Sequence, residues 1–503
     1  MKSHTKKTIL TLAITAGLGM SSSVFADSQN SATITQTTNE ENAIGQEAFI
    51  EQSGDLNIAV ITQEGNDQSA TIVQEGISHE ANTESTGIDN NIEVDQTDDS
   101  HISNVKVTGN NNQVYVAQYD KLNNTSMDVT GHNNSTDIMQ DGTNNNTTTS
   151  LIGDNNTSDM NQTGDSNISS FFVEGNDNNA DITQVGSSNT VDMSSLNMMP
   201  NIVGDNNDLE SYQDGSENSA AVNDLIGNDN NFVMSQIGAN NLGAVFALSG
   251  SDNEIEIDQE GDNNIASLSF AQGDDNFFEV NQIGMNNTIG GTLIAELQGN
   301  DNDINIEQEG DNNSLVFQAI GDDTDVFLDQ EGNTNLATFG AYGNDNDFTL
   351  RSDGDGNELK AYAEGDDNAI DISQEGNINF GKTEIIGSDN EIDIEQDGND
   401  NEAFISIAGV DNTDIETTQV GDLNLIDLIL TGDDNGTLIT QTGNGNWIGG
   451  KDDGAFIVTG DSNSLTIAQT GNDNLTLGSQ TGMDNTISVT QTGDFNTATV
   501  IQN

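Results

Sequence analysis

The dominant feature of this sequence is an alternation of apolar and polar residues that returns at a fixed interval. In the segment 302–313, Ile304, Ile306 and Gln308 occupy one phase, and acidic or amide residues occupy the other. Alternation with a period of two is typical of a β-strand with one covered face and one solvated face. The same line returns in segments 253–261, 390–398 and 485–493. The pattern therefore predicts a chain built from many copies of one short strand.

Glycine marks the interval between copies. From Gly54 to Gly186 every eleventh position is glycine, except that Asp98 and Asp120 take its place twice. Steps of 11 or 12 residues continue through most of the chain to Gly493. Each unit is expected to form a strand of about seven residues and a Gly-x-x-Asn turn. Glycine supplies a positive φ there at no steric cost, and Asp or Asn tolerates it next best.

Two kinds of unit alternate through the middle of the chain, because only every second unit ends in Gln-x-Gly. This alternation predicts an all-β fold, a parallel β-solenoid with two strands per rung and roughly 20 rungs. Rungs stacked about 4.8 Å apart close a thin core between two sheets. Buried amides can then bond their own copies one rung away, which favours in-register parallel stacking. The predicted stacking ladder consists of Gln52, Gly54, Asn57, Gln63, Gln140, Gln162, Gln184, Gln259, Gln308, Gln330, Gln374, Gln396, Gln441, Gln469, Gln480, Gln491, Gly493, Asn496 and Gln502.

Composition alone suggests a different class of protein. Hydrophobic residues make up 32% of the chain and the formal net charge is −76, values that also fit an acidic disordered chain. The strict register argues against disorder. The acidity excludes a basic stripe for nucleic acid or for an anionic membrane. The absence of cysteine excludes a disulfide framework.

The first 26 residues differ from the rest. A positive start is followed by an apolar run over 9–20 and by small or apolar residues at 24–26. We interpret 1–26 as a secretory signal peptide, with a buried N-terminal helix as the alternative. Residues 27–46 are expected to form a flexible N-terminal leader or a frayed first strand. The solenoid is expected over 47–503, with loops near 194–203, 288–296 and 447–456. No later stretch is apolar and long enough to predict membrane insertion.

The outward residues are expected to differ between the two sheets. The Gln-bearing units direct acidic residues outward, as at Glu254, Glu256 and Asp258. The other units are less acidic and have some apolar or aromatic outward residues, namely Val316, Ile320, Tyr342, Tyr362, Ile386 and Phe404. Like charges stacked on neighbouring strands repel each other. We therefore expect one strongly anionic side, and assembly that is favoured by divalent cations, high salt or mild acid.

One motif resembles a known family. Gln-x-Gly-x-x-Asn-x-Ala-x-x-x-Gln is complete over 52–63 and 491–502, and its shorter Gln-x-Gly-x-x-Asn core recurs along most of the chain. It is similar to the curlin repeat of curli, the secreted amyloid fibres of bacterial biofilms. The resemblance implies a two-strand solenoid, a curli-type export channel, a nucleator subunit, cell-surface fibres for adhesion and matrix, and no catalysis. Whether the chain would be a major subunit, a nucleator or a curlin relative is left open.

No catalytic, cofactor or metal site is expected. Carboxylates are abundant, but each lies in a repeat beside its copies, so none is singled out as an acid catalyst. His79, His101 and His132 are expected to be scattered surface residues rather than a metal site. Asp-Asn turns offer oxygen ligands, but no EF-hand or β-roll motif is present, which leaves only weak surface binding of Ca²⁺.

Two functions fit these observations. The first is a secreted structural protein that self-assembles into curli-like amyloid fibres, because uncapped terminal rungs expose strand edges that template another copy. The alternative is a monomeric secreted solenoid that binds surface glycans, calcium or ice through its flat faces. Outward threonines such as Thr440, Thr442, Thr490 and Thr492 hint at an ice-binding row, but acidic rungs interrupt it.

Overall fold

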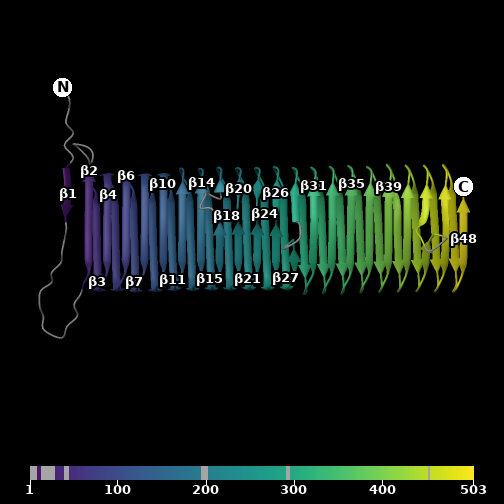
Figure 1. The fold of residues 1–503 in the computed structure, drawn as a ribbon, viewed down its shortest axis with the longest axis horizontal. Helices are drawn as coiled ribbons and strands as arrows, with labels where there is room; N and C mark the ends of the chain where they lie inside the picture. The colour runs from purple at the N-terminus through teal and green to yellow at the C-terminus, as the bar shows by residue number, and fades with distance from the viewer. Residues whose placement is uncertain (1–7, 13–28, 39–44, 194–201, 291–294, 451–453) are drawn as a thin grey trace, which may run out of the picture. The chain divides into compact units, whose positions relative to one another are not determined.

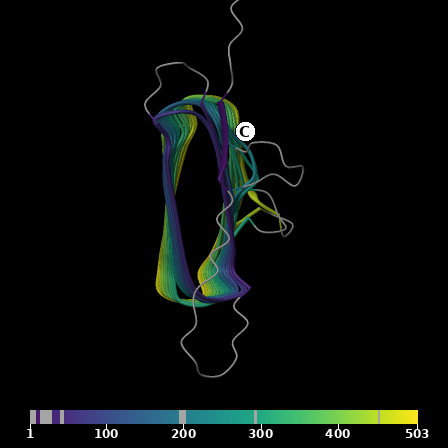
Figure 2. The same cartoon turned by 90° about the vertical axis from the view of Figure 1, so that its left-hand side faces the viewer.

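The protein was analysed as a computed structural model that describes residues 8–12, 29–38, 45–193, 202–290, 295–450 and 454–503. The chain divides into two units, 1–251 and 252–503. Each unit is a parallel β-solenoid of two facing sheets, and the described residues contain no helix (Figure 1). Figure 2 shows the two sheets as two layers joined by turns at both edges. The predicted fold class, with about 20 rungs in total, is confirmed.

We call the sheet whose strands carry the glutamine ladder sheet B, and the facing sheet A. Sheet B of the first unit contains β3 (Glu47–Asp55), β5 (Ser69–Ile77), β7 (Asn91–Asp99), β9 (Gln113–Lys121), β11 (Ser135–Thr143), β13 (Thr157–Asp165), β15 (Asn179–Ser187), β18 (Asp208–Ser216) and β21 (Asn231–Ala239). Sheet A of this unit contains β2 (Ser31–Thr38), β4 (Ile58–Asn66), β6 (Glu80–Ile88), β8 (Ile102–Asn110), β10 (Asn124–His132), β12 (Asn146–Ile152), β14 (Ile168–Glu174), β16 (Thr190–Met193), β17 (Ile202–Val203), β19 (Ser219–Val222), β20 (Leu225–Ile226), β22 (Leu242–Val245) and β23 (Leu248–Ser249).

The second unit repeats this plan. Its sheet B contains β24 (Glu254–Asp262), β27 (Phe277–Met285), β30 (Asp303–Glu309), β32 (Asp325–Glu331), β34 (Asp347–Asp353), β36 (Ala369–Glu375), β38 (Glu391–Asp397), β40 (Asp414–Val420), β42 (Gly436–Thr442), β45 (Ser464–Thr470) and β47 (Thr486–Thr492). Its sheet A contains β25 (Ile265–Leu268), β26 (Phe270–Gln272), β28 (Thr288–Ile289), β29 (Ala295–Gln298), β31 (Ser314–Ile320), β33 (Leu336–Tyr342), β35 (Glu358–Glu364), β37 (Phe380–Ile386), β39 (Glu402–Ala408), β41 (Leu425–Thr431), β43 (Trp447–Gly449), β44 (Phe456–Thr459), β46 (Leu475–Thr481) and β48 (Thr497–Gln502).

Strands one rung apart pair in parallel and in register. In β11 and β13, for example, Ile138 lies beside Met160 and Gln140 beside Gln162. Early strands such as β3 have nine residues rather than the seven we predicted, because the backbone around Gly54 also pairs with the next rung. Strands such as β30 have seven. In the 12-residue steps that begin at Gly215, Gly238 and Gly261, the sheet A strand is divided in two, as in β19 and β20, whereas β40 in the 12-residue step after Gly409 stays whole.

The core lies between the two sheets and is filled by every second residue. Ile304 and Ile306 are fully buried, as the alternation predicts. Aromatic side chains from both sheets meet in the second unit, where the ring centroids of Phe278 in sheet B and Phe317 in sheet A lie 5.9 Å apart. Full burial of a side chain of this size stabilises a fold by about 1.5–3 kcal/mol. One rung contributes few such residues, so its stability depends on its neighbours.

Part of the N-terminal segment forms a strand. Within 27–46, residues Ser31–Thr38 form β2, which pairs in parallel with β4, because its Ala-x-Ile-x-Gln pattern fits that edge. β2 coincides with the first strand that we gave as the alternative to a flexible leader. β1 (Thr8–Leu12) pairs antiparallel with β2. The rest of the predicted signal peptide, 1–7 and 13–26, lies outside the described residues.

Parts of the three predicted loops also lie outside the described residues, namely 194–201, 291–294 and 451–453. Their flanks belong to strands rather than loops. β17, β28 and β43 each pair with sheet A strands of neighbouring rungs. Pro200 falls in the first of the undescribed stretches. None of the described segments is a helix that could cross a membrane.

Candidate functional site

The first candidate site is a glutamine ladder that runs along the interior of sheet B. In the first unit, Gln52 Nε2 donates to Gln74 Oε1 at 2.8 Å, and each later glutamine donates to the next at 2.8–2.9 Å. The donors all point toward the C-terminal end of the stack. The members are Gln52, Gln74, Gln96, Gln118, Gln140, Gln162, Gln184, Gln213 and Gln236.

In the first unit, the second hydrogen of each ladder amide bonds the facing sheet. Gln74 Nε2 donates to the Ile58 carbonyl at 2.9 Å, and Gln140 Nε2 donates to the Asn124 carbonyl at 3.1 Å. Both glutamines are fully buried. An unpaired buried amide costs about 1–3 kcal/mol, so this double use of the donor makes a polar interior tolerable. The ladder therefore connects successive rungs, and also the two facing sheets, through hydrogen bonds.

The ladder in the second unit has one break. Ser352 occupies the glutamine position between Gln330 and Gln374 in the register of sheet B. Gln330 Nε2 and Gln374 Oε1, the two atoms on either side of the break, have no hydrogen-bond partner. Elsewhere the bonds are 2.7–2.9 Å long and link Gln259, Gln282, Gln308 and Gln330, then Gln374, Gln396, Gln419, Gln441, Gln469 and Gln491.

A second set of ladders lines the two turn edges of each rung. Asn134 Nδ2 donates to the Gly153 carbonyl of the next rung at 2.8 Å, and the Asn156 backbone N–H donates to Asn134 Oδ1 at 2.9 Å. Both asparagines are buried. The same two bonds recur rung after rung. The asparagine of Gly-x-x-Asn therefore joins its own turn to the turn of the next rung through hydrogen bonds.

Glycine is required where successive turns touch. A Cβ placed on Gly153 would lie 1.8 Å from the Gly175 carbonyl oxygen, and its φ is 130°. Asp98 and Asp120 take positive φ values of 85° and 67° at glycine positions, as predicted. The close approach explains why glycine persists in nearly every repeat.

Two histidines replace asparagine in one edge ladder, which corrects the expectation of scattered surface residues. His79 and His101 are fully buried, and their rings stack 5.1 Å apart. The Asn123 backbone N–H donates to His101 Nδ1 at 3.2 Å, and His101 Nε2 lies 2.7 Å from the Thr97 carbonyl. A neutral Nε2–H tautomer satisfies both contacts. Burial lowers the pKa of both imidazoles, although Asp98 opposes this.

The structure places the predicted ladder residues in both sheets. Gln63, Gln480 and Gln502 lie in sheet A, and the remaining predicted glutamines lie in sheet B. The ladder also includes seven glutamines outside that predicted list, namely Gln74, Gln96, Gln118, Gln213, Gln236, Gln282 and Gln419. Gln96 and Gln118 precede Asp98 and Asp120, so a search for Gln-x-Gly misses them. The repeat period would have found all seven.

Carboxylates form columns on the outer face of sheet B, as expected. One column in the second unit contains consecutive exposed acids one rung apart. Partial burial and neighbouring carboxylates raise the pKa of Asp393, which lies in another column. The described residues contain no group of three or more His, Asp or Glu side chains placed to bind a metal ion. The column of consecutive exposed acids comprises Glu309, Glu331, Asp353, Glu375 and Asp397.

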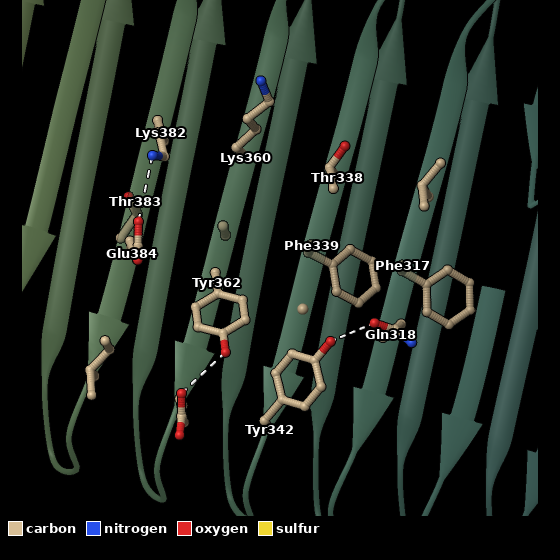
Figure 3. Close-up of a pocket in the computed structure, with 15 residues that line it drawn as sticks. Phe317, Gln318, Thr338, Phe339, Tyr342, Lys360, Tyr362, Lys382, Thr383 and Glu384 are labelled. Atoms are coloured by element: carbon tan, nitrogen blue, oxygen red, sulfur yellow. Dashed lines mark hydrogen bonds and ion pairs between the residues drawn. The ribbon is translucent and has the colours of Figure 1, made fainter. Parts of the chain in front are cut away.

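A shallow groove of about 880 Å³ crosses the outer face of sheet A over β31–β37 (Figure 3). The rings of Tyr342 and Tyr362 lie 5.3 Å apart on its floor. Gly340 lies beside both rings, so a Cβ there would crowd them. Lys360 and Lys382 also line the groove, each ion-paired with a glutamate of its own strand. It is an aromatic platform with polar groups on an otherwise acidic molecule.

The last rung of the second unit ends in open strand edges. Among the described strands, β47 pairs with β45 alone and β48 pairs with β46 alone. The sheet B ladder ends at Gln491, whose Nε2 donates only to the Leu475 carbonyl. At the N-terminal end, the only described strand that pairs with β3 is β5, and the Oε1 of Gln52 lies outside the ladder bonds. One end thus offers a donor and the other an acceptor.

Comparison with known protein families matches the curlin associated repeat to ten segments that together span more than half of the chain. The chain belongs to the curlin-repeat family. The matched segments are 47–76, 131–164, 153–186, 204–248, 250–284, 299–332, 321–354, 387–413, 460–493 and 482–503. A search of curated proteins found no match to this curlin-repeat chain. Family membership and the solenoid fold point to a structural, non-enzymatic protein.

Proposed function

We propose that this curlin-repeat protein is secreted and assembles head to tail into curli-like amyloid fibres that serve cell adhesion and the biofilm matrix. The observation that carries the proposal is the polarity of the sheet B ladder. In each unit, every described bond between ladder glutamines runs from the lower to the higher residue number, so the open end at β47 is complementary to the open end at β3. Unpaired edges of this kind template further strands.

The other parts of the proposal rest on family membership. A signal peptide over 1–26 would direct the chain out of the cytoplasm, and a curli-type channel and a nucleator subunit would be its partners. The carboxylate columns would slow premature assembly by repulsion, as charged gatekeepers do. Weak surface binding of Ca²⁺ to these columns would relieve part of that repulsion.

A charge buried at the junction should stop assembly. Val500 of β48 points toward the core and is partly exposed only because its rung is the last. In Val500→Lys the ammonium group can reach water in the monomer but not in a junction. Ile501→Lys is the matched control, because Ile501 faces outward and is 52% exposed.

The measurement is thioflavin T fluorescence and negative-stain microscopy of the purified chain from Asp27. We expect filaments from the wild type and from Ile501→Lys, and none from Val500→Lys. A wild type that stays monomeric at high concentration, at low or high salt and at neutral or mildly acidic pH, would refute the proposed function.

The groove on sheet A supports a second candidate function, the binding of a surface glycan. Sugar rings stack on aromatic faces, and Tyr342 and Tyr362 present two such faces beside Gln318. Co-sedimentation with insoluble polysaccharides tests this function. Tyr342→Ala/Tyr362→Ala should lose retention, whereas Phe404→Ala on a neighbouring strand should keep it. Equal retention of all three proteins would exclude the groove as the site.

A further inference from the structure

The order of strands at the two ends raises a problem for a seamless junction. In a continuous stack, the sheet B strand that pairs with β47 is followed by a sheet A strand that pairs with β48. If β3 of a second copy pairs with β47, the strand that follows it is β4, so β48 must pair with β4. The structure shows that edge of β4 already occupied by β2. Only one of the two strands can pair with it.

The two competing strands carry nearly the same sequence. Residues 30–36 read Asn-Ser-Ala-Thr-Ile-Thr-Gln, and residues 496–502 read Asn-Thr-Ala-Thr-Val-Ile-Gln. In both strands the alanine, the β-branched residue and the glutamine share one face of the strand. β48 therefore offers β4 the same inward side chains as β2 does, except that Val500 takes the place of Ile34.

The polar contacts of β2 can be transferred as well. Asn30 Nδ2 donates to the Gly54 carbonyl, and Asn30 Oδ1 accepts from the Asn57 backbone N–H, both at 2.9 Å. Gln36 Nε2 donates to Gln63 Oε1 at 2.8 Å. Asn496 and Gln502 have the same groups at the same spacing.

Glutamine at this inward position is confined to the ends of sheet A. Among its described strands, only four have glutamine there, and elsewhere the position holds Ser, Val, Leu, Ile or Ala. Gln480 is fully buried with neither amide atom bonded, and Gln502 Oε1 is also unpaired. The two ends therefore match each other better than they match the middle of the sheet. The four residues are Gln36, Gln63, Gln480 and Gln502.

The connection to the next strand shows which competitor can leave. β2 ends at Thr38 and β3 begins at Glu47, whereas β3 and β4 are separated only by two residues. β48 follows β47 through an ordinary turn. The inward side chains of β2 are also only half-buried, unlike Ala59 and Ile61 of β4. β2 therefore has the longer connection to its neighbour in the chain and the less buried contact with β4.

We propose that β2 is an exchangeable cap: during assembly, β48 of a second copy displaces β2 from the edge of β4, while β47 of that copy pairs with β3. The inference rests on the proposed head-to-tail assembly and adds its mechanism. The cap keeps the N-terminal edge of sheet A covered in the monomer. Its departure precedes each junction and slows the first steps of assembly.

Paired cysteines test the exchange, since the chain has no cysteine of its own. Thr33 of β2 lies beside Val60 of β4, and Thr499 of β48 would take the place of Thr33. Neighbouring strands bring Cα atoms within the range for a disulfide. Filaments grown from a mixture of Thr499→Cys and a size-tagged Val60→Cys protein are oxidised and separated on a non-reducing gel. We expect the mixed dimer from this pair, and none from Thr499→Cys with size-tagged Thr33→Cys.

A lock within one chain gives a kinetic readout. In Thr33→Cys/Val60→Cys the disulfide holds β2 on β4, so we expect the oxidised protein to elongate at least tenfold more slowly than the same protein after reduction. Filaments that cross-link positions 33 and 499 instead, or that grow equally fast with the lock closed, would overturn the exchange and leave assembly intact. A wild type that forms no filaments would refute the proposed function itself, and the exchange with it.

Discussion

Completing the broken ladder in the second unit should stabilise the protein. In Ser352→Gln, the new Oε1 would accept from Gln330 Nε2, and the new Nε2 would donate to Gln374 Oε1. Both of these existing atoms are buried without a partner. Gln330 and Gln374 are each within 1% of full burial, so the repair removes two costs of about 1–3 kcal/mol each.

The new side chain also loses rotamer freedom. Burying a glutamine costs about 1.5–2 kcal/mol of conformational entropy, more than the serine that it replaces. The two relieved atoms outweigh this cost, and we expect a net gain of about 2 kcal/mol. The new residue would occupy the position that glutamine occupies in nine-tenths of the ladder's rungs or more, so the strand pairing accommodates its volume.

Urea unfolding followed by circular dichroism, at a concentration below that of assembly, measures the gain. Ser373→Gln is the matched control, because Ser373 lies next to Gln374 but faces outward. We expect the control to stay within about 0.5 kcal/mol of the wild type. If Ser352→Gln is no more stable than the wild type while the control is unchanged, the ladder does not contribute as argued.

Three further predictions follow from the ladders, the turns and the columns. Burial lowers the pKa of His79 and His101, so the unfolded chain binds protons more readily than the folded chain does. The urea midpoint of the wild type should therefore fall as pH drops below about 6.5. His79→Asn/His101→Asn, which restores the residue type of neighbouring rungs, should remove that part of the fall. Gly153→Ala should cost about 2–5 kcal/mol in urea unfolding, because it combines a strained φ with a backbone clash, whereas Gly454→Ala, with nothing within 4 Å, should be nearly neutral. Asp371→Asn/Asp393→Asn should raise the free energy of unfolding at pH 7 and low salt by about 1 kcal/mol or less per neighbouring pair of carboxylates, and added salt should reduce this difference. Because burial raises the pKa of both carboxyls, the wild type should become as stable as the variant as pH falls toward 4.

The fold could be predicted from the sequence because the same alternation of apolar and polar residues, followed by the same turn residues, recurs in nearly every repeat. The alternation in 302–313 identified the buried residues Ile304, Ile306 and Gln308 without reference to any other rung. Positive φ at Asp98 and Asp120 followed from glycine spacing alone. In-register pairing followed from the cost of an unpaired buried amide.

Three features depended on contacts that no single repeat specifies. The burial of His79 and His101 requires knowledge of which edge ladder they enter, since a surface histidine and a ladder histidine look alike in the sequence. The break at Ser352 becomes visible only when its neighbours are placed above and below it. The strand at Ser31–Thr38 is out of phase with the repeat, because a longer connection links it to β3.

The central claim is that residues one rung apart lie side by side on parallel strands, and paired spin labels test it most directly. Thr157 and Asn179 are exposed neighbours in the first unit, and Ser464 and Thr486 are exposed neighbours in the second. Labels on either pair should lie about 5 Å apart and show strong spin exchange in the soluble monomer. Dipolar broadening without spin exchange, as expected if antiparallel hairpins place such residues about 10 Å apart, would contradict the account.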